Sequence, residues 1–261
     1  MSTKFAYFKG CVADQSAKEN DMATRAVCKK IGIELKTMPF HCCGGGLVHE
    51  VDNYRYRALN EHNLDIAENE GLDIMTICSV CNYSLKLAGR EYGRRDLEIK
   101  SLEEIVILEI GLEKLKESVV RKFEGTKIAP FYGCKSLRPA EFNPFGDSAD
   151  PHYLEDIILG LGGNPVKYSN SRKCCGFPNL YVNKDVAIKL SNEILRDATE
   201  NNAELIITPC PLCQMMLDIY QKKNLRIPVL HFSQFLGLAL GISKKELGLG
   251  MNMTSTESLT G

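Results

Sequence analysis

Ten of the eleven cysteines in this 261-residue chain fall into two sets that have the same order along the sequence. Each set consists of a single cysteine, an adjacent pair and a Cys-x-x-Cys motif, with the same gap between pair and motif. The sets are Cys11, Cys42, Cys43, Cys78 and Cys81, and Cys134, Cys174, Cys175, Cys210 and Cys213. Thiolates are soft ligands for zinc and iron. The pattern therefore predicts two metal or redox sites.

The number of cysteines in each set favours an iron–sulfur cluster over a single metal ion. Four cysteines complete a tetrahedral zinc site or an ordinary cubane cluster, so five are one more than either needs. Adjacent cysteines also suit two neighbouring metals better than one. Zinc in one of the sets remains an alternative. Disulfides are the weakest interpretation, because the chain shows no secretion signal and a reducing compartment does not favour them.

The composition is that of an ordinary globular protein, with 44% hydrophobic and 25% charged residues. A net charge of −1 gives no basic surplus that would indicate nucleic-acid binding. Residues 1–8 lack the long apolar segment of a signal peptide, and no stretch offers the roughly 20 apolar residues of a membrane span. We therefore expect a cytoplasmic protein without a membrane span.

The residues around the cysteines repeat as well, which indicates an internal duplication. Phe8–Cys11 resembles Phe131–Cys134, with glycine directly before the cysteine in both. A glycine follows each adjacent pair, and Ile74–Cys78 resembles Ile206–Cys210. One shared order, one identical gap and matching flanks are difficult to obtain by chance.

The same elements are predicted in each half. Apolar runs predict strands over Lys4–Phe8, Leu72–Ile77, Lys127–Phe131 and Glu204–Thr208. Apolar residues at helical spacing lie between them, at 23–31, 154–161 and 186–198. Strands that alternate with helices predict an α/β fold, with a small parallel sheet flanked by helices in each half.

This arrangement places the cysteines at the carboxyl edge of each sheet, where open α/β folds bind ligands. The single cysteine of each set, and the first cysteine of each Cys-x-x-Cys motif, directly follow an expected strand. Cys81 and Cys213 then lie in the first turn of the next helix, a position that also suits Pro211. The free N–H groups of a helix N-terminus favour a thiolate over a thiol.

The sequence divides into four parts. We expect a first cysteine domain over 1–96 and a second over 127–241. Apolar residues such as Leu102, Ile105, Leu112 and Leu115 predict a packed helical connector over 97–126. The polar tail, 242–261, is expected to be disordered or to dock a partner.

Four other residues have alternative interpretations. Cys28 lies beside an apolar helical stripe, which indicates a small core residue. His41 adjoins the first cysteine pair. It is interpreted as a hydrogen-bond donor to a sulfur, as a zinc ligand or as a surface residue. His49 has two interpretations: it donates a proton to a leaving thiolate, or it is itself a loop residue exposed to water. His231 precedes an apolar helix and suits an interface or a helix cap.

The repeated pattern of a single cysteine, Cys-Cys-Gly and Cys-x-x-Cys resembles the cysteine-rich CCG domain. The whole chain, from Phe5 to Gly241, is similar to the B-type subunits of heterodisulfide reductases, including Thr208–Cys213 and Ile227–His231. The resemblance implies that each set of five cysteines holds a noncubane [4Fe-4S] cluster. It further implies cleavage or formation of a disulfide between the two clusters, such as the heterodisulfide of coenzymes M and B in methanogenesis.

The resemblance also implies partners. Electrons would come from a cubane-cluster subunit of the C type, behind which stands a flavoprotein subunit of the A type. The chain itself contains no C-x₂-C-x₂-C-x₃-C motif, which agrees with a separate electron donor. The substrate would be a small disulfide or thiol. Lys135, Arg138 and Arg172 flank the second set and would attract an anionic thiol, or else form a solvated surface.

Two departures from the methanogen type lie near the expected substrate. Gly44–Gly46 follows the first cysteine pair where that type has proline, and Arg138–Tyr153 is compact. Both concern the choice of substrate more than the clusters. One alternative is therefore a related subunit of a sulfur-oxidising or a quinone- or dicarboxylate-linked complex. Another is a zinc-stabilised adaptor without catalytic activity.

Overall fold

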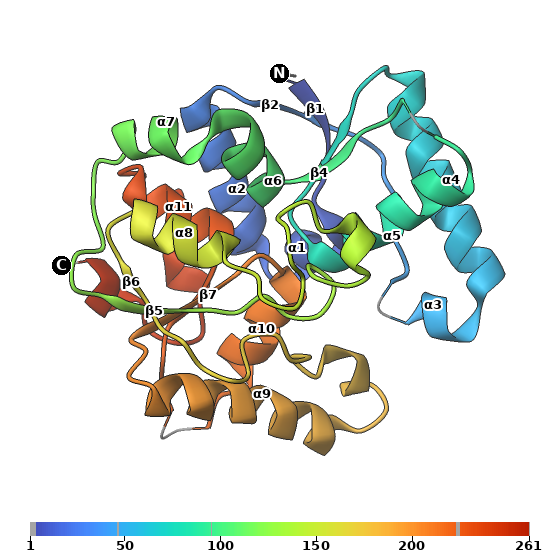
Figure 1. Ribbon diagram of the computed structural model, residues 1–261. Helices are drawn as coiled ribbons and strands as arrows, with labels where there is room; N and C mark the ends of the chain where they lie inside the picture. The colour runs from blue at the N-terminus through green and yellow to red at the C-terminus, as the bar shows by residue number, and fades with distance from the viewer. Residues whose placement is uncertain (1–3, 46, 95, 223–224, 261) are drawn as a thin grey trace.

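Eight short strands form two parallel sheets in the part of the chain that the structure describes (Figure 1). This computed structural model describes residues 4–45, 47–94, 96–222 and 225–260. The first sheet contains β1 (Lys4–Phe8), β2 (Glu34–Thr37), β3 (Ile74–Thr76) and β4 (Ile99–Ser101), in the order β2-β1-β3-β4. The second contains β5 (Lys127–Pro130), β6 (Asn164–Pro165), β7 (Leu205–Thr208) and β8 (Val229–His231), in the order β6-β5-β7-β8. The predicted duplicated α/β fold is confirmed.

The central strands of each sheet are those that the sequence predicts. β1 and β3 lie side by side, as do β5 and β7, and almost all their residues are buried. The edge strands β2 and β6 have exposed or half-buried residues and give no continuous apolar run, so the sequence does not predict them. β4 and β8 are three residues long and run straight into helices.

Helices cover the sheets (Figure 1). In the first half they are α1 (Gly10–Gln15), α2 (Lys18–Ile31), α3 (Val48–Val51), α4 (Asn53–Asn69) and α5 (Ser79–Glu91). In the second half they are α8 (Tyr153–Gly160), α9 (Lys184–Glu200), α10 (Pro211–Ile219) and α11 (Phe232–Ala239). Short 3-10 turns occupy η2 (Ala140–Phe142), η3 (Phe177–Asn179), η4 (Leu249–Met251) and η5 (Glu257–Thr260).

Capping side chains start the two long helices that follow the cysteine pairs. The Asp52 carboxylate accepts a hydrogen bond from the backbone N–H of Arg55 at the start of α4. Asn183 accepts one from the N–H of Val186 at the start of α9. Each contact satisfies a donor that the helix leaves free, and such a cap is worth about 1 kcal/mol.

The segment 97–126 is not only helical. It supplies β4, which extends the first sheet through the pairing of Ile99 with Ile74. It continues as α6 (Leu102–Glu104), a π-helical segment η1 (Ile105–Ile110) and α7 (Leu112–Glu117). The helical part packs as predicted, since Leu102, Ile105 and Leu115 are buried. The predicted boundary after residue 96 would assign β4 to the connector, although β4 pairs with β3 in the first sheet. The limits of the four parts of the chain stay a prediction.

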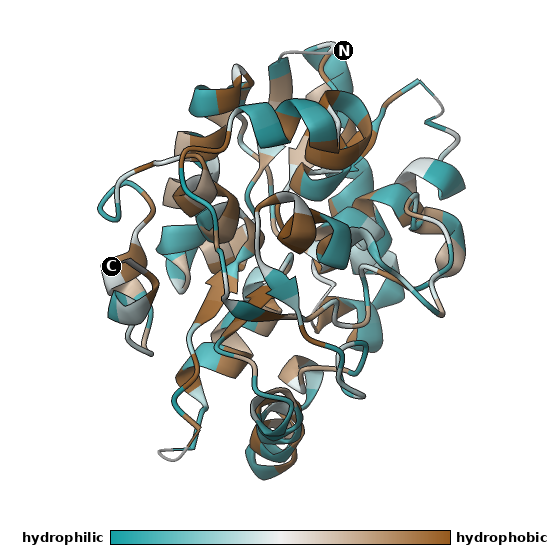
Figure 2. Cartoon of the chain, turned by 60° about the vertical axis from the view of Figure 1, so that its left-hand side comes forward, coloured by the Kyte–Doolittle hydropathy of each residue, from teal (hydrophilic) through white to brown (hydrophobic). Residues whose placement is uncertain are grey.

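The two halves share their hydrophobic core. One buried cluster contains Tyr7 and Met75 of the first half together with Leu154 and Phe235 of the second. Figure 2 shows hydrophobic residues along the strands and hydrophilic residues over much of the surrounding helices. α2 of the first half also packs on α11 of the second. The position of one sheet edge relative to the other is therefore set by a common core.

The tail packs on the second half of its own chain. Leu247, Leu249 and Leu259 are buried. The Asp218 carboxylate accepts hydrogen bonds from the N–H groups of Met253 and Thr254, at 2.7 and 2.9 Å. This described part of the tail is therefore packed on the chain rather than disordered, and its docking of a partner stays a prediction.

Candidate metal centres

The carboxyl ends of the central strands deliver the cysteines. Cys11 lies in α1, directly after β1, and Cys78 is the N-cap of α5, directly after β3. Cys210 is likewise the N-cap of α10, after β7. Cys81 and Cys213 lie in the first turns of α5 and α10, as predicted from the spacing.

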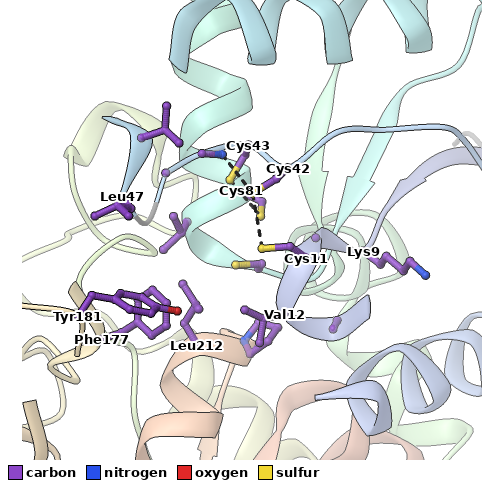
Figure 3. Close-up of a pocket in the computed structure, with 18 residues that line it drawn as sticks. Lys9, Cys11, Val12, Cys42, Cys43, Leu47, Cys81, Phe177, Tyr181 and Leu212 are labelled. Carbon is purple, nitrogen blue, oxygen red and sulfur yellow. Dashed lines mark hydrogen bonds between the residues drawn. The ribbon is translucent and has the colours of Figure 1, made fainter. Parts of the chain in front are cut away.

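Five sulfur atoms gather in the first half. Cys11 Sγ lies 3.5 Å from Cys42 Sγ, and Cys43 Sγ lies 3.4 Å from Cys81 Sγ (Figure 3). Cys78 also contacts Cys81. The backbone N–H of Gly44 donates to Cys42 Sγ at 3.4 Å. Gly46, the last residue of the glycine run, lies outside the described residues.

The second half repeats these contacts. Cys134 contacts Cys174, and Cys175 contacts Cys213. Cys210 also contacts Cys213, and the N–H of Gly176 donates to Cys174 Sγ at 3.4 Å. The duplication visible in the sequence is therefore also a duplication of sulfur geometry.

The two sets meet at their inner cysteines. Cys78 Sγ and Cys210 Sγ are 4.0 Å apart, and both side chains are buried. Towards the outside, Cys11 and Cys42 are exposed, whereas Cys134 and Cys174 are half-buried. The ten sulfurs thus form one continuous series, closed to solvent in the middle and open at its ends.

Sulfur contacts separate the acidities of the thiols. The contact with Cys11 lowers the pKa of Cys42 to about 2, and the contact with Cys134 lowers the pKa of Cys174 to about 2. The pKa of Cys43 rises to about 11, chiefly through its contact with Cys42. The contacts of Cys210 with Cys213 and Cys78 also hold its pKa well below the usual range. Each set therefore holds at least one cysteine whose neighbours favour the thiolate, which is the form that binds metals.

The surroundings of these sulfurs fit an iron–sulfur group. Soft thiol donors suit iron and zinc. Gly10 and Gly133 have φ angles of +76° and +71°, and a Cβ there would lie 3.1 Å from Cys81 Sγ and 3.0 Å from Cys213 Sγ. A larger residue would therefore press on a sulfur in each set. Among the described residues, no group of three or more His, Cys, Asp or Glu side chains forms a ready-made site for one metal ion.

Two cavities lie beside the sets and share walls. The first, of about 220 Å³, reaches Cys11, Cys42 and Cys43. The second, of about 120 Å³, reaches Cys134, Cys174 and Cys175. Both are lined by Gly45, Val80, Phe177 and Leu212. The sequence does not single out these apolar wall residues, although Leu212 lies within a Cys-x-x-Cys motif.

The histidines near the first set have ordinary partners. His41 lines a third, polar cavity beside Cys11, and its backbone N–H donates to Asn63 Oδ1 at 2.8 Å. His49 lines the second cavity, and its Nδ1 lies 3.2 Å from Glu50 Oε1. The structure therefore places His49, from the first half, beside the cysteines of the second.

The predicted basic residues separate into two groups. Lys135 lines the second cavity, with its Nζ 3.7 Å from the centroid of the Tyr83 ring. Arg138 and Arg172 are not among the described residues that line it. Arg172 Nη1 instead lies 4.0 Å from Asp150 Oδ1.

His231 joins the two halves beside the inner cysteines. Its side chain is buried, and its Nε2 donates to the carbonyl of Ile77, the residue before Cys78, at 3.0 Å. Its Nδ1 accepts from the N–H of Ser233 and so caps α11. Burial lowers the pKa of His231 to about 4, so the ring is neutral at neutral pH. It is both an interface and a capping residue.

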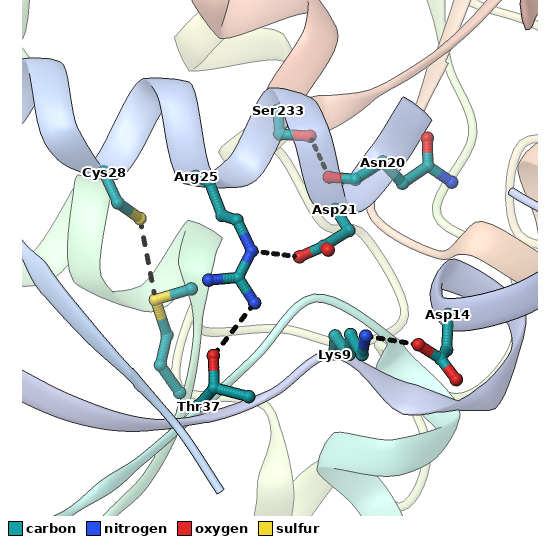
Figure 4. Close-up of polar contacts among 9 residues, drawn as sticks. Lys9, Asp14, Asn20, Asp21, Arg25, Cys28, Thr37 and Ser233 are labelled. Carbon is teal, nitrogen blue, oxygen red and sulfur yellow. Dashed lines mark hydrogen bonds and ion pairs between the residues drawn. The ribbon is translucent and has the colours of Figure 1, made fainter. Parts of the chain in front are cut away.

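Cys28, the eleventh cysteine, lies apart from the sets. It is fully buried in α2, and its Sγ is 3.9 Å from Met75 Sδ (Figure 4). Nearby, Arg25 donates to Asp21 and Thr37, at 2.9 and 3.2 Å. Burial raises the pKa of Cys28 to about 12, which keeps it a neutral core thiol.

The sequence family follows from a direct comparison. Residues 5–86 and 128–218 match the cysteine-rich domain family CCG, one copy in each half. The chain belongs to the CCG family. The two matched segments of this CCG protein contain all ten clustered cysteines.

Two relatives span nearly the whole CCG chain. The 8-methylmenaquinol:fumarate reductase membrane anchor subunit of Wolinella succinogenes is 36% identical, over 99% of this chain and 100% of the relative. The B-type subunit of a ferredoxin/F420H2-dependent CoB-CoM heterodisulfide reductase of Methanosarcina acetivorans is 28% identical, over 95% of this chain and 93% of the relative. The predicted resemblance to heterodisulfide reductases is thus correct at the level of related redox subunits, and a quinol-linked relative is more similar.

A solved structure supports the fold. A hypothetical protein from Helicobacter pylori superposes with a TM-score of 0.76 at 15% identity, over 97% of this chain. The CCG chain spans about half of that protein, 52% of its length. Within the described residues, no helix is long and apolar enough to cross a membrane.

Proposed function

We propose that this CCG protein is an electron-transfer subunit of a quinone- and dicarboxylate-linked oxidoreductase complex. Its two cysteine sets would hold two [4Fe-4S] clusters. The observation that carries the proposal is the contact between the sets, since Cys78 and Cys210 are 4.0 Å apart. Similarity to a methylmenaquinol:fumarate reductase subunit over the entire chain supports this class of complex.

The ligands of the first cluster would be Cys11, Cys42, Cys43, Cys78 and Cys81, and those of the second Cys134, Cys174, Cys175, Cys210 and Cys213. When bound, such clusters exchange single electrons. The chain contributes burial of the inner sulfurs and N–H donors to the outer ones, at Gly44 and Gly176. Solvent exposure and hydrogen bonds to sulfur are two of the factors that set the reduction potential of thiolate-bound iron.

Electrons must enter or leave through other subunits. We infer partners with cubane clusters or a flavin, because the sequence has no cubane motif of its own. The exposed end of the sulfur series, at Cys11 and Cys42, leaves the first site accessible from outside. The buried inner pair connects that site with the second one.

Metal analysis tests the proposal first. The chain is purified without oxygen, and iron, acid-labile sulfide and zinc are measured. Two four-iron clusters give about eight irons and eight sulfides per chain. The visible absorbance of these clusters should decrease when a naphthoquinol is added, because the naphthoquinol reduces them. Zinc without sulfide, even after anaerobic reconstitution, would leave only the adaptor function and contradict the proposal.

Disulfide chemistry is the second candidate. The similarity to a B-type subunit of a heterodisulfide reductase and the meeting of two cysteine sets both favour it. The same reduced clusters can be mixed with a small disulfide or with an oxidised quinone. Reoxidation by the disulfide alone would identify this second function, and reoxidation by the quinone alone would support the first.

A further inference from the structure

The cavity beside the first set has two chemically different ends. One end is formed by the cysteines and by Gly44 and Gly45. The other is formed by apolar side chains from both halves: Val12, Leu47, Val48, Val80, Phe177, Tyr181, Pro211 and Leu212. A cavity with a reactive end and an apolar wall suits a hydrophobic ligand that presents one edge to the metal site.

Charge in this cavity is low. Lys9 is the one lysine or arginine among its described lining residues, and it forms an ion pair with Asp14. Asp and Glu do not occur among those residues. A substrate with a sulfonate, phosphate or carboxylate would lose its hydration here with little compensation. The cavity therefore favours an uncharged ligand.

The second cavity differs, although it belongs to the duplicated site. Its described lining includes His49, Glu50 and Lys135. These side chains can hydrogen-bond and carry charge, and they add to the apolar wall of Val80, Phe177 and Leu212 that the second cavity shares with the first. The two sites thus share the cysteine pattern and differ in the polar side chains that line the cavity beside it.

The mouth of the first cavity is bordered by exposed apolar residues. Figure 3 shows Leu47 on one side and Tyr181 with Phe177 on the other. Leu47 is 47% and Tyr181 is 67% exposed. Their neighbours Val51 and Val182, each just before the N-cap of a long helix, are 73% and 82% exposed. A hydrophobic molecule meets apolar surface before it enters.

We propose that this cavity binds the ring of a lipophilic quinone, which enters between Leu47 and Tyr181. The proposal rests on the proposed function, to which it adds the binding site and its entrance. An uncharged, flat, two-sided ring matches the apolar walls supplied by Phe177 and Leu212, and such contact is worth about 25 cal/mol per Å² of buried apolar area. The ring's edge would then face the first cysteine set.

The test measures binding rather than turnover. The iron-loaded chain is dialysed to equilibrium without oxygen against oxidised 2,3-dimethyl-1,4-naphthoquinone, whose substituted ring carbons resist addition by thiols. The variants are Leu47→Glu and Tyr181→Glu, which place a carboxylate at the mouth on exposed side chains. Leu159→Glu on α8 is the matched control, since Leu159 is 58% exposed and does not line the cavity.

We expect binding by the wild type and by Leu159→Glu, and about tenfold weaker binding by each mouth variant, which corresponds to about 1.4 kcal/mol. Iron content should be equal in all four proteins. Equal affinity in all four would place the quinone elsewhere and overturn the proposal. If the naphthoquinol reduces the clusters in that case, the proposed function stands and only the site is wrong. No binding and no reduction would remove both.

Discussion

At the scale of single residues, the two kinds of cysteine have different tasks. The clustered cysteines contact one another at 3.4 to 4.0 Å, whereas Cys28 contacts Met75 within the core. Spacing in the sequence separates the ten from the one, because the ten repeat and Cys28 has no counterpart. What spacing does not give is the contact between the sets, because it depends on how the halves pack.

Replacement of an inner cysteine should remove one cluster. We expect Cys78→Ser to lower iron to about half, roughly four per chain, because it takes one ligand from the first set. Cys28→Ala is the control and should keep its iron, at a cost in stability of about 1 kcal/mol. Iron and sulfide analysis after anaerobic purification checks both. Full iron content in Cys78→Ser would contradict the ligand assignment.

His231 makes stability depend on pH. Its pKa is about 4 in the folded chain and about 6.5 when unfolded, so the unfolded state binds an extra proton between these values. Stability contributed by the neutral ring is therefore present above pH 6.5 and decreases as the pH falls towards 4, by about 3 kcal/mol in all. Melting temperatures of the wild type should fall between pH 7 and 5 more than those of His231→Gln.

His152→Gln is the control for this comparison, since His152 is exposed and paired with Asp150. It should keep the pH dependence of the wild type. Parallel curves for the wild type and His231→Gln would show that the buried ring does not carry the effect.

At the scale of elements, the strand-to-helix turns carry the site. Gly10 and Gly133 open these turns with positive φ. Each lies against the sulfur of the second cysteine in the Cys-x-x-Cys motif of its own set, Cys81 and Cys213. The flanking Phe8–Cys11 and Phe131–Cys134 repeats already indicate a special turn. The edge strands and the apolar cavity are different, since β2 and β6 have weak patterns and the cavity wall comes from both halves.

Gly10→Ala separates strain from crowding. Gly71 has a φ of +64° and nothing within 4 Å of an added Cβ, so Gly71→Ala has the backbone strain alone. Each substitution should cost about 1 kcal/mol for the left-handed conformation. Only Gly10→Ala should also lower iron loading, because its methyl would lie 3.1 Å from Cys81 Sγ. Equal iron in both variants would show that the close approach is not needed.

At the scale of the whole molecule, the tail fastens the second half. The Asp218 carboxylate forms one side of this contact, and the N–H groups of Met253 and Thr254 form the other. Composition alone could not reveal it, because the tail is polar and Met253 lies 35 residues from Asp218. The buried leucines of the tail, Leu247, Leu249 and Leu259, are the signal in the sequence that indicates packing.

Loss of this contact should destabilise the chain. We expect Asp218→Asn to cost about 1 to 3 kcal/mol, because an amide replaces a carboxylate that accepts two backbone hydrogen bonds. Glu117→Gln, at an exposed position on α7, should change stability by less than about 0.5 kcal/mol. Thermal unfolding followed by circular dichroism compares them. Equal melting temperatures would mean that the Asp218 contact contributes nothing to stability.

The contact between Cys78 and Cys210 has a meaning in terms of symmetry. The two residues are equivalent in the duplication, being the first cysteines of the two Cys-x-x-Cys motifs, and they touch each other. In a two-fold arrangement, a residue meets its own counterpart only near the axis. An approximate dyad thus passes between these sulfurs, and the chain is organised like a homodimer joined into one polypeptide. Once joined, the two sites no longer had to stay identical, and among the described lining residues His49, Glu50 and Lys135 belong to the second cavity and not to the first.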